Sequence, residues 1–400
     1  MPLSSNQLAT SNRASIRYVE ETSFGVTPAT APTALRFTGE SLDLAITKTV
    51  SKEIRNDRLT SDMIPTDIAS NGGIMFEQIY GEYDPFIAGV LGGSFVRYGT
   101  LGKGAAVSLT LAPTTLTAGT APTGNDAFTN LVKGQWFRLT APGSASDGQV
   151  LQVSPTIAPT STVITISAAT PVLGSGVVAA CVIAANRVTD GTVNRSFSIE
   201  RSFDDIGQFF IFRGMMPSKL SMDFVSSAIM TGSVDFMGKN GAVQNTTYFT
   251  GTPVASQTFS PLNSVTGIGN VLIDGVALSN TFIKSVKFSV DGKIRGLQAI
   301  GAYGPAAMAQ GTLMISGTME IYLADGTQYN KFVNNTDTSV TFGGRDGTNR
   351  GYQITFPRVK YGDAKVQAGG LDQDAMLSIP FTALVDSATG HSILFDAFTV

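Results

Sequence analysis

The sequence has 400 residues, a formal net charge of −3 at pH 7 and a pI of about 5.3. A chain of this length usually needs more than one hydrophobic core, so we expect two or three domains. Charged residues make up only 14% of the chain, against roughly 25% in typical soluble domains. Such a weakly charged, slightly acidic chain is unsuited to gripping nucleic acid through its phosphates. It favours a subunit whose surface is covered by copies of itself.

Cysteine content and hydropathy indicate in which compartment the protein folds and whether it is attached to a membrane. Cys181 is the only cysteine, so no intramolecular disulfide forms and the fold does not depend on an oxidising compartment. The N-terminal sequence MPLSSNQLATSNR lacks the basic-then-apolar pattern of a secretory signal. The longest apolar run, residues 176–185, is shorter than the roughly 20 residues that span a membrane. We expect a protein that folds in a cytoplasm and carries no membrane anchor.

The first predicted elements are a strand, a long excursion, a second strand and a short helix. The strand covers residues 35–46, and the excursion of residues 47–69 holds the densest charged segment of the chain. The charged residues of that segment are Lys52, Glu53, Arg55, Asp57 and Arg58. Mixed signs are typical of a solvated loop, or of a contact loop that pairs with complementary charges on another subunit. Its place at the tip of the excursion favours a contact between subunits or rings. The helix begins at Tyr83, with Pro85 early and Gly92 after it.

Residues 97–192 differ in character from the rest of the chain. They are rich in Ala, Thr, Gly and Pro, carry few charges and contain short strand patterns such as GQWFRLTAPG and TVITISAATP. We interpret them as a small inserted β-domain that stands off the main body. Its aromatic residues Phe128, Trp136 and Phe137 offer a platform for a glycan, but Trp136 is better explained as the anchor of the insert's own small core.

Strand patterns with period two dominate the remainder. In residues 219–224, Leu220, Met222 and Phe224 alternate with polar residues, and residues 285–290 repeat the pattern. Asp-Gly pairs, which supply the positive φ angles of tight turns, separate many of these strands. A second short helix is predicted over residues 326–335. The polar residues 241–268 are predicted to link two parts of the chain.

An internal repeat relates those two parts. Residues 71–86 (NGGIMFEQIYGEYDPF) align with residues 316–332 (SGTMEIYLADGTQYNKF) when one residue is allowed to slip. The aligned pairs are Gly72/Gly317, Ile74/Met319, Phe76/Ile321 and Gly81/Gly326, and a Tyr-x-x-Phe at each predicted helix start is formed by Tyr83, Phe86, Tyr329 and Phe332. Both parts share one order of elements: a strand pair with a long tip, a helix, two strands and a closing strand. That order favours a duplication over a chance likeness.

Enzymatic chemistry finds no support. The single histidine, His391, falls in the second repeat and Cys181 in the insert, so a Cys–His pair is not expected. No Gly-x-Ser-x-Gly elbow, phosphate loop or zinc spacing is present. The acidic clusters Glu20–Glu21, Asp204–Asp205 and Asp372/Asp374 lack the dense spacing of a calcium loop. We therefore expect no catalytic residue, no metal site and no cofactor.

Several phrases resemble one family. The segments IRYVEETSFGVTPATAPTALRFTGESL, SKEIRNDRLTSDMI and RSFSIERSFDDIGQFFIFRGMMPSKLSMDF resemble the major tail tube proteins of long-tailed, siphovirus-type bacteriophages. The resemblance covers about two thirds of the chain and leaves residues 97–192 outside it. It implies an all-β dominated fold of duplicated tail-tube β-sandwich or barrel domains, each with a short flanking helix, plus the inserted domain.

The resemblance also implies an organisation and a function. The first tail-tube domain takes residues 1–96 and 193–240, the insert 97–192, the linker 241–268, and the second domain 269–400. Copies of the chain would form stacked rings, with three chains supplying six domains, or six chains if the duplication is not real. DNA would pass down the channel, and the tape-measure, terminator and tip proteins would be partners in a virion tail assembled in the host cytoplasm. The low pI, rather than the resemblance, suggests an acidic channel that repels DNA and lets it slide. The alternatives are a head decoration or tail-tip protein, and a glycan-binding adhesin.

Overall fold

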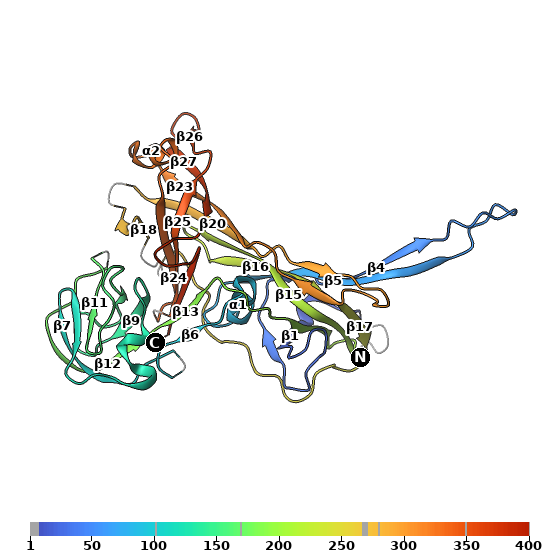
Figure 1. The fold of residues 1–400 in the computed structure, drawn as a ribbon, viewed down its shortest axis with the longest axis horizontal. Coiled ribbons are helices and arrows are strands. Elements are labelled where there is room, and N and C mark those ends of the chain that lie inside the picture. Colours follow the sequence, from blue (N-terminus) through green and yellow to red (C-terminus); the bar gives the residue numbers. More distant parts are fainter. Residues whose placement is uncertain are drawn as a thin grey trace, which may run out of the picture.

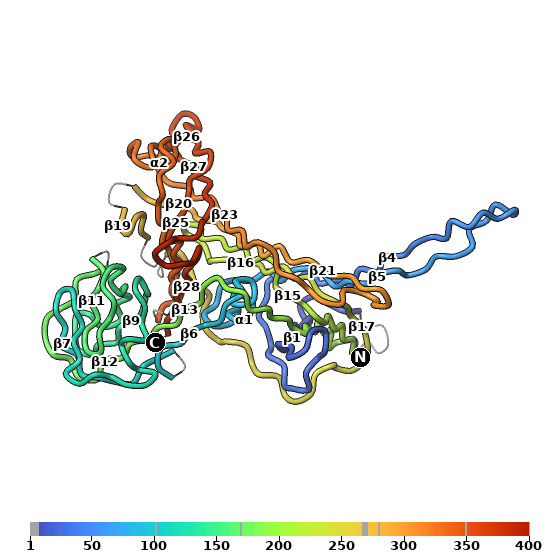
Figure 2. The backbone as a smooth tube through the Cα atoms, viewed as in Figure 1, coloured from blue at the N-terminus to red at the C-terminus, as the bar shows by residue number. Residues whose placement is uncertain are grey.

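The computed structural model describes residues 8–100, 102–168, 170–265, 271–278, 281–348 and 350–399. Within these ranges the chain is mostly antiparallel β-strand, with two α-helices, so the all-β prediction is confirmed. Figure 1 shows a body from which a long two-stranded arm projects on one side, with a separate group of short strands on the other. Figure 2 traces the same path as a continuous backbone.

We call the N-terminal group of elements the first unit. It comprises β1 (Ala14–Glu20), β2 (Thr33–Leu35), β3 (Gly39–Glu40), β4 (Asp43–Val50), β5 (Met63–Glu77), α1 (Asp84–Leu91), β14 (Phe197–Phe203), β15 (Gln208–Val225), β16 (Thr231–Gly238) and β17 (Asn240–Gln244). Its strands pair in the order β2-β1-β14-β15-β16-β5-β4, and β17 pairs with the first half of β15. A short 3₁₀ turn, Ser11–Arg13, precedes β1.

The C-terminal group forms the second unit. It comprises β18 (Leu272–Ile273), β19 (Val276–Ala277), β20 (Ile283–Asp291), β21 (Arg295–Leu297), β22 (Ala307–Ala309), β23 (Met314–Tyr322), α2 (Thr327–Val333), β24 (Thr338–Arg345), β25 (Gly351–Tyr361), β26 (Lys365–Ala368), β27 (Ala375–Ala383) and β28 (Leu394–Phe398). The strand order is β19-β18-β24-β25-β27-β23-β20, and β28 pairs with the first half of β25. Element by element, this is the order of the first unit.

Details of register agree between the units. In the first, β15 carries an extra residue where it passes Phe197 and Ile199 of β14, and in the second, β25 carries one where it passes Thr338 and Val340 of β24. The aligned glycines of the sequence repeat lie in corresponding strands, since Gly72 is in β5 and Gly317 in β23. The repeat found in the sequence therefore extends to strand order, pairing and a local irregularity.

The second half of β15 joins the two units in one sheet. It pairs with β20 from Lys219 opposite Asp291 to Val225 opposite Ser285. The joined sheet runs β4-β5-β16-β15-β20-β23-β27, and the end of β25 together with β26 pairs with the far side of β27. None of the sheets in the described part of the chain closes into a barrel. One edge of the joined sheet is therefore β4 and the other is β26.

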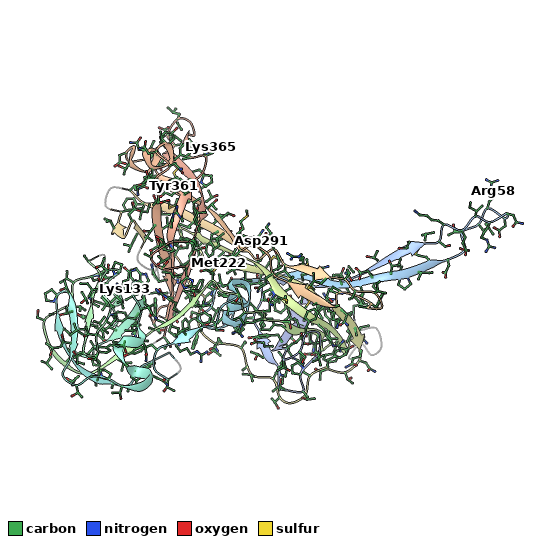
Figure 3. The ribbon with its side chains drawn as sticks, in the orientation of Figure 1. Arg58, Lys133, Met222, Asp291, Tyr361 and Lys365 are labelled. Carbon is green, nitrogen blue, oxygen red and sulfur yellow. The ribbon has the colours of Figure 1, made fainter. Side chains whose placement is uncertain are left out.

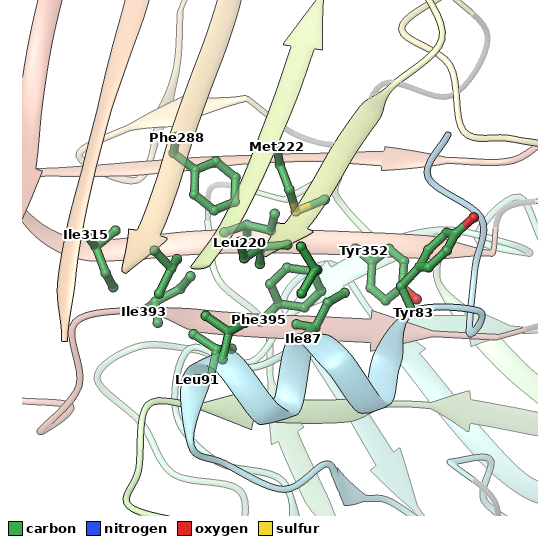
Figure 4. Close-up of a cluster of buried hydrophobic side chains, with 14 of the residues drawn as sticks. Tyr83, Ile87, Leu91, Leu220, Met222, Phe288, Ile315, Tyr352, Ile393 and Phe395 are labelled. Atoms are coloured by element: carbon green, nitrogen blue, oxygen red, sulfur yellow. The ribbon is translucent and has the colours of Figure 1, made fainter. Parts of the chain in front are cut away.

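Helix α1 lies under this junction. Its Ile87 and Leu91 belong to the same buried cluster as Leu220 of β15 and Phe395 of β28 (Figure 4). Each fully buried side chain of this size stabilises the fold by about 1.5–3 kcal/mol. The helix ends at Gly92, whose φ of 64° favours glycine. Both predicted helices are confirmed.

The inserted segment folds as a second sheet. Its elements are β6 (Val96–Arg97), β7 (Val107–Ala112), β8 (Thr115–Ala118), two 3₁₀ turns (Gly124–Asp126 and Phe128–Asn130), β9 (Trp136–Thr140), β10 (Val150–Gln152), β11 (Val163–Thr165), β12 (Gly176–Ala184) and β13 (Asn186–Thr189). Six of these strands pair in the order β10-β9-β12-β7-β8-β11 and enclose their own hydrophobic cluster. The paired strands β6 and β13 connect this sheet to the body.

The composition of residues 97–192 suggested a domain that stands off the body, but the segment packs against the second unit. Trp136 is fully buried in a cluster with Val150, and with Leu272 and Phe398 of the second unit. The expectation that Trp136 anchors the insert's own core is therefore also wrong. An indole is large enough to close a gap between two sheets, and here it fills the gap between the insert and the second unit.

Candidate functional site

The predicted contact loop lies at the far end of the arm made by β4 and β5, where Figure 3 labels Arg58. Arg55 donates to Asp57 from Nε at 3.0 Å and from Nη2 at 2.6 Å, and this bond holds the pKa of Asp57 below its usual value. Lys52 and Glu53 are exposed beside them. The side chain of Ile54 is fully exposed at the same tip. A single exposed apolar residue is ordinary on a protein surface, and contact of this loop with another subunit stays a prediction.

The four repeat positions at the helix starts lie in different environments. Tyr83 is the N-cap of α1, stacks on Phe76 at 3.8 Å and donates its hydroxyl to a backbone oxygen. Phe86 follows in the first turn and is buried. Tyr329 lies within α2, and its ring contacts Phe332 with centroids 5.8 Å apart. The first pair is buried and the second pair lies close to solvent, and a structural role for all four stays a prediction.

A hydrogen-bonded contact between the two units is centred on Tyr352 of β25. Its hydroxyl accepts from the N–H of Gly81 at 2.7 Å and donates to the carboxylate of Asp84 at the start of α1. Its ring stacks on Tyr80 at 5.4 Å. Burial raises the pKa of Asp84 to about 6, although the bond from Tyr352 and the charge of Arg97 oppose the rise. No local pattern in the sequence indicates this contact, because Tyr352 and Asp84 are far apart in the chain.

A buried ion pair fixes the insert to the second unit. Arg187 of β13 donates to Asp396 of β28 from Nε and from Nη2, each at 2.7 Å. Asp396 also accepts from the backbone N–H of Trp136 at 3.2 Å, and the indole Nε1 donates to Thr355 at 3.3 Å. Burial raises the pKa of Asp396, and Arg187 opposes the rise. Arg187 donates in addition to the carbonyl of Gly134 at 2.9 Å. Sequence analysis did not single out this pair either.

The joined sheet has one apolar and one polar face. Successive side chains of a strand point to opposite faces, so the residues between those that cover α1 point away from it. Ser221 and Ser289 lie directly opposite each other there, and Ser289 lies opposite Ser316. Lys287 pairs with Asp223 across the junction, with Nζ and Oδ2 3.3 Å apart. Asp235 and Asp291 lie on either side of Lys219 on this face, and Glu77 and Glu320 add two more carboxylates. The face therefore offers many hydroxyl groups and more acidic than basic side chains.

Among the described residues, no group of three or more His, Cys, Asp or Glu side chains is placed to hold a metal ion. His391 lies 3.3 Å from Asp190, and Cys181 is buried in the insert. Phe128 and Phe137, like Trp136, are fully buried, so the aromatic platform considered for glycans is not on the surface. Neither helix in the described ranges is long and apolar enough to cross a membrane.

Comparison with known proteins agrees with this architecture. A family model described as phage tail tube protein matches residues 11–383. No curated protein matches the sequence. The matched range takes in both units and the insert, so it covers nearly the whole chain. Proteins of that family are structural components of the virion tail, not enzymes, and assemble into a tube with other tail proteins. The chain therefore belongs to the phage tail tube protein family.

Proposed function

We propose that three copies of the chain close into a ring, and that rings stack into the tube of a siphovirus tail through which DNA is ejected. The observation that carries this proposal is the continuous sheet of two similar units with a free strand at each edge. A heterologous contact between such edges closes when the rotation per unit is right. Because each chain supplies two units, three chains supply six. Six chains per ring remain the alternative.

Ring closure also answers a hazard of the free chain. All four residues of β26 are exposed, and β4 is exposed along nearly its whole length. Open strand edges of this kind invite uncontrolled pairing unless they are covered. Pairing the edges of neighbouring chains covers both and extends the sheet around a channel.

The polar face of the joined sheet is suited to line that channel. Its serines carry no charge and its carboxylates outnumber its lysines, so it presents a net negative charge to a phosphate backbone. DNA that releases few counterions on contact is held weakly and slides. A lining of this sign repels the phosphates, as the low pI suggested. We propose in addition that the arms contact the next ring, with the tape-measure, terminator and tip proteins as further partners, in a tail assembled in the host cytoplasm.

Electron microscopy of the purified protein tests the tube against the alternatives. A tube protein gives long hollow tubes of variable length. A head decoration protein or a tail-tip protein gives single rings or bounded particles at every protein concentration, and that result would overturn the proposal.

A further inference from the structure

We call the strand pairing that joins the two units the filled junction. The outer strands at the two edges of the sheet correspond to the strands of this junction, but they are not paired with each other within the chain. At the filled junction, the second half of β15 in the first unit pairs with β20 in the second. The strand of the second unit that corresponds to this half of β15 is β26, since both pair with the closing strand of their unit. The counterpart of β20 in the first unit is the segment of β3 and β4, since both pair with the strand that precedes the helix.

Strand pairings fix the residue that corresponds to Lys365. The alignment of β5 with β23 carries over to their partners, so that Ser233 of β16 corresponds to Ser378 of β27. Ser233 lies opposite Ser221 of β15, and Ser378 lies opposite Lys365 of β26. Lys365 therefore holds the place of Ser221.

Strand pairings also identify the residue of the second unit that corresponds to Asp43. Ser289 of β20 lies opposite Ser316 of β23, and Asp43 of β4 lies opposite Asn71 of β5. Ser316 and Asn71 each come one residue before the aligned glycine of the repeat. Asp43 therefore holds the place of Ser289.

We infer that β26 of one chain pairs with the β3–β4 segment of the next chain in the register of the filled junction. Ser221 lies opposite Ser289 in that register, so Lys365 of one chain lies opposite Asp43 of its neighbour. The exposed ammonium of Lys365 and the exposed carboxylate of Asp43 then take the places of the two serines. Side chains of opposite sign that face each other across an antiparallel pair stabilise it. The inference rests on the ring proposed above and names the contact that closes it.

The neighbouring position supports the same register. Met222 lies opposite Phe288 at the filled junction. Its counterpart Val366 is 48% exposed in the free chain, so it has apolar surface left to bury. In the inferred register, Val366 comes to lie opposite Leu42 of the neighbouring chain and loses contact with water.

In the free chain, side chains already cover the β3–β4 edge at Leu42. Its N–H donates to Glu40 at 2.8 Å, and its carbonyl accepts from Arg201 at 3.2 Å. Glu40 and Arg201 are also paired, with 2.9 Å between Oε1 and Nη1. These bonds keep the edge satisfied before assembly, as edge strands of soluble chains require.

The two helices give independent support. Residues 86–91 of α1 are all buried, whereas Gln328 is the buried residue of α2 and Val333 is 61% exposed. The second unit covers α1, with Phe395 of β28 against it (Figure 4). In the first unit, the corresponding place beside β15 belongs to Val243, which is 56% exposed. The rotation that pairs β26 of one chain with the next chain brings Val243 of that next chain onto α2 of the first.

Charge exchange at the two positions tests the register. The variants are Lys365→Glu, Asp43→Lys and the double exchange, with Lys133→Glu as a control that changes the charge of an exposed lysine in the insert. The measured quantity is the protein concentration at which half of the chains sediment as rings, at low salt. We expect each single exchange to raise it about tenfold, which corresponds to about 1.4 kcal/mol. The double exchange restores the wild-type value, and the control leaves it unchanged.

Two results would overturn the inference while leaving the proposed function intact. One is wild-type rings of three chains that assemble equally well in the single variants and in the control. The other is single variants that fail without recovery in the double exchange, which would place the two residues apart. Wild-type protein that forms no ring of three would instead overturn the proposed function. All three positions are exposed, so the circular dichroism of each monomer should match the wild type.

Discussion

Removing the carboxylate of Asp396 should detach the insert from the second unit. The side chain of Asp396 is fully buried, and it accepts two bonds from Arg187 and one from the backbone of Trp136. In Asp396→Ala, the guanidinium stays buried at 8% exposure and keeps only its bond to Gly134. Breaking a buried ion pair by removing one partner costs about 3–5 kcal/mol.

Trp136 reports on this change directly, because it is the only tryptophan of the chain and lies within the network. Urea unfolding of the monomer, followed by tryptophan fluorescence, should show the transition of Asp396→Ala at a clearly lower urea concentration than wild type. Asp57→Ala is the matched control, since it also removes an aspartate bonded twice to an arginine, but at the exposed tip of the arm. A transition of Asp396→Ala within about 1 kcal/mol of that control would refute the reasoning, since the expected buried-pair loss is several times larger.

Three further predictions concern the arm, the contact between the units and the insert. Charge reversal at Arg55 and Arg58 should weaken ring stacking in a salt-dependent way, and normal tube lengths in micrographs at low salt would discard the contact role of the arm. Because the folded-state pKa of Asp84 is raised from 3.8 to about 6, its proton stabilises the folded chain below about pH 4 and this contribution is lost as the pH rises through 6. Wild-type monomer should therefore be less stable at pH 7.5 than at pH 5, by at most about 1.4 kcal/mol, because pH 5 lies one unit below the folded-state pKa of about 6. An equal pH dependence in Asp84→Asn would contradict this. Replacing residues 97–192 by a short linker should lower the melting temperature, because Leu272 loses the side chains that bury it. Ring assembly should stay intact, and a soluble, folded deletion protein that never assembles would contradict this.

Much of the architecture follows from local sequence patterns. The alternation in residues 219–224 and 285–290 gives strands whose apolar residues are buried, because the period of two matches the pleat. Pro85 and Gly92 bound α1 where helix starts and stops require them. The repeat could be detected because it preserves the order of elements, even where residue identities differ.

The docking of the insert could not be predicted in the same way. Composition indicates that residues 97–192 fold separately, but it does not reveal which face is covered by another part of the chain. A hint was present at Arg187 and Asp396, since each stands alone in an otherwise apolar stretch. A charge in such a stretch usually finds a buried partner, but the partner lies 209 positions away and only the fold identifies it.

The register between neighbouring chains also needs the fold. Lys365 and Asp43 look like ordinary solvated charges in the sequence, and nothing local connects them. Only the paired strands of the two units show that they hold the places of Ser221 and Ser289. The surface that assembles is therefore encoded by a topology that occurs twice, and not by a motif.

Cryo-electron microscopy of assembled tubes tests the central claim most directly, because it counts the chains in each ring. The account predicts three chains per ring, six similar units around the channel, and a continuous sheet in which β26 of each chain adjoins β4 of the next. Six chains per ring, or rings of three in which β26 stays exposed to solvent, would contradict it.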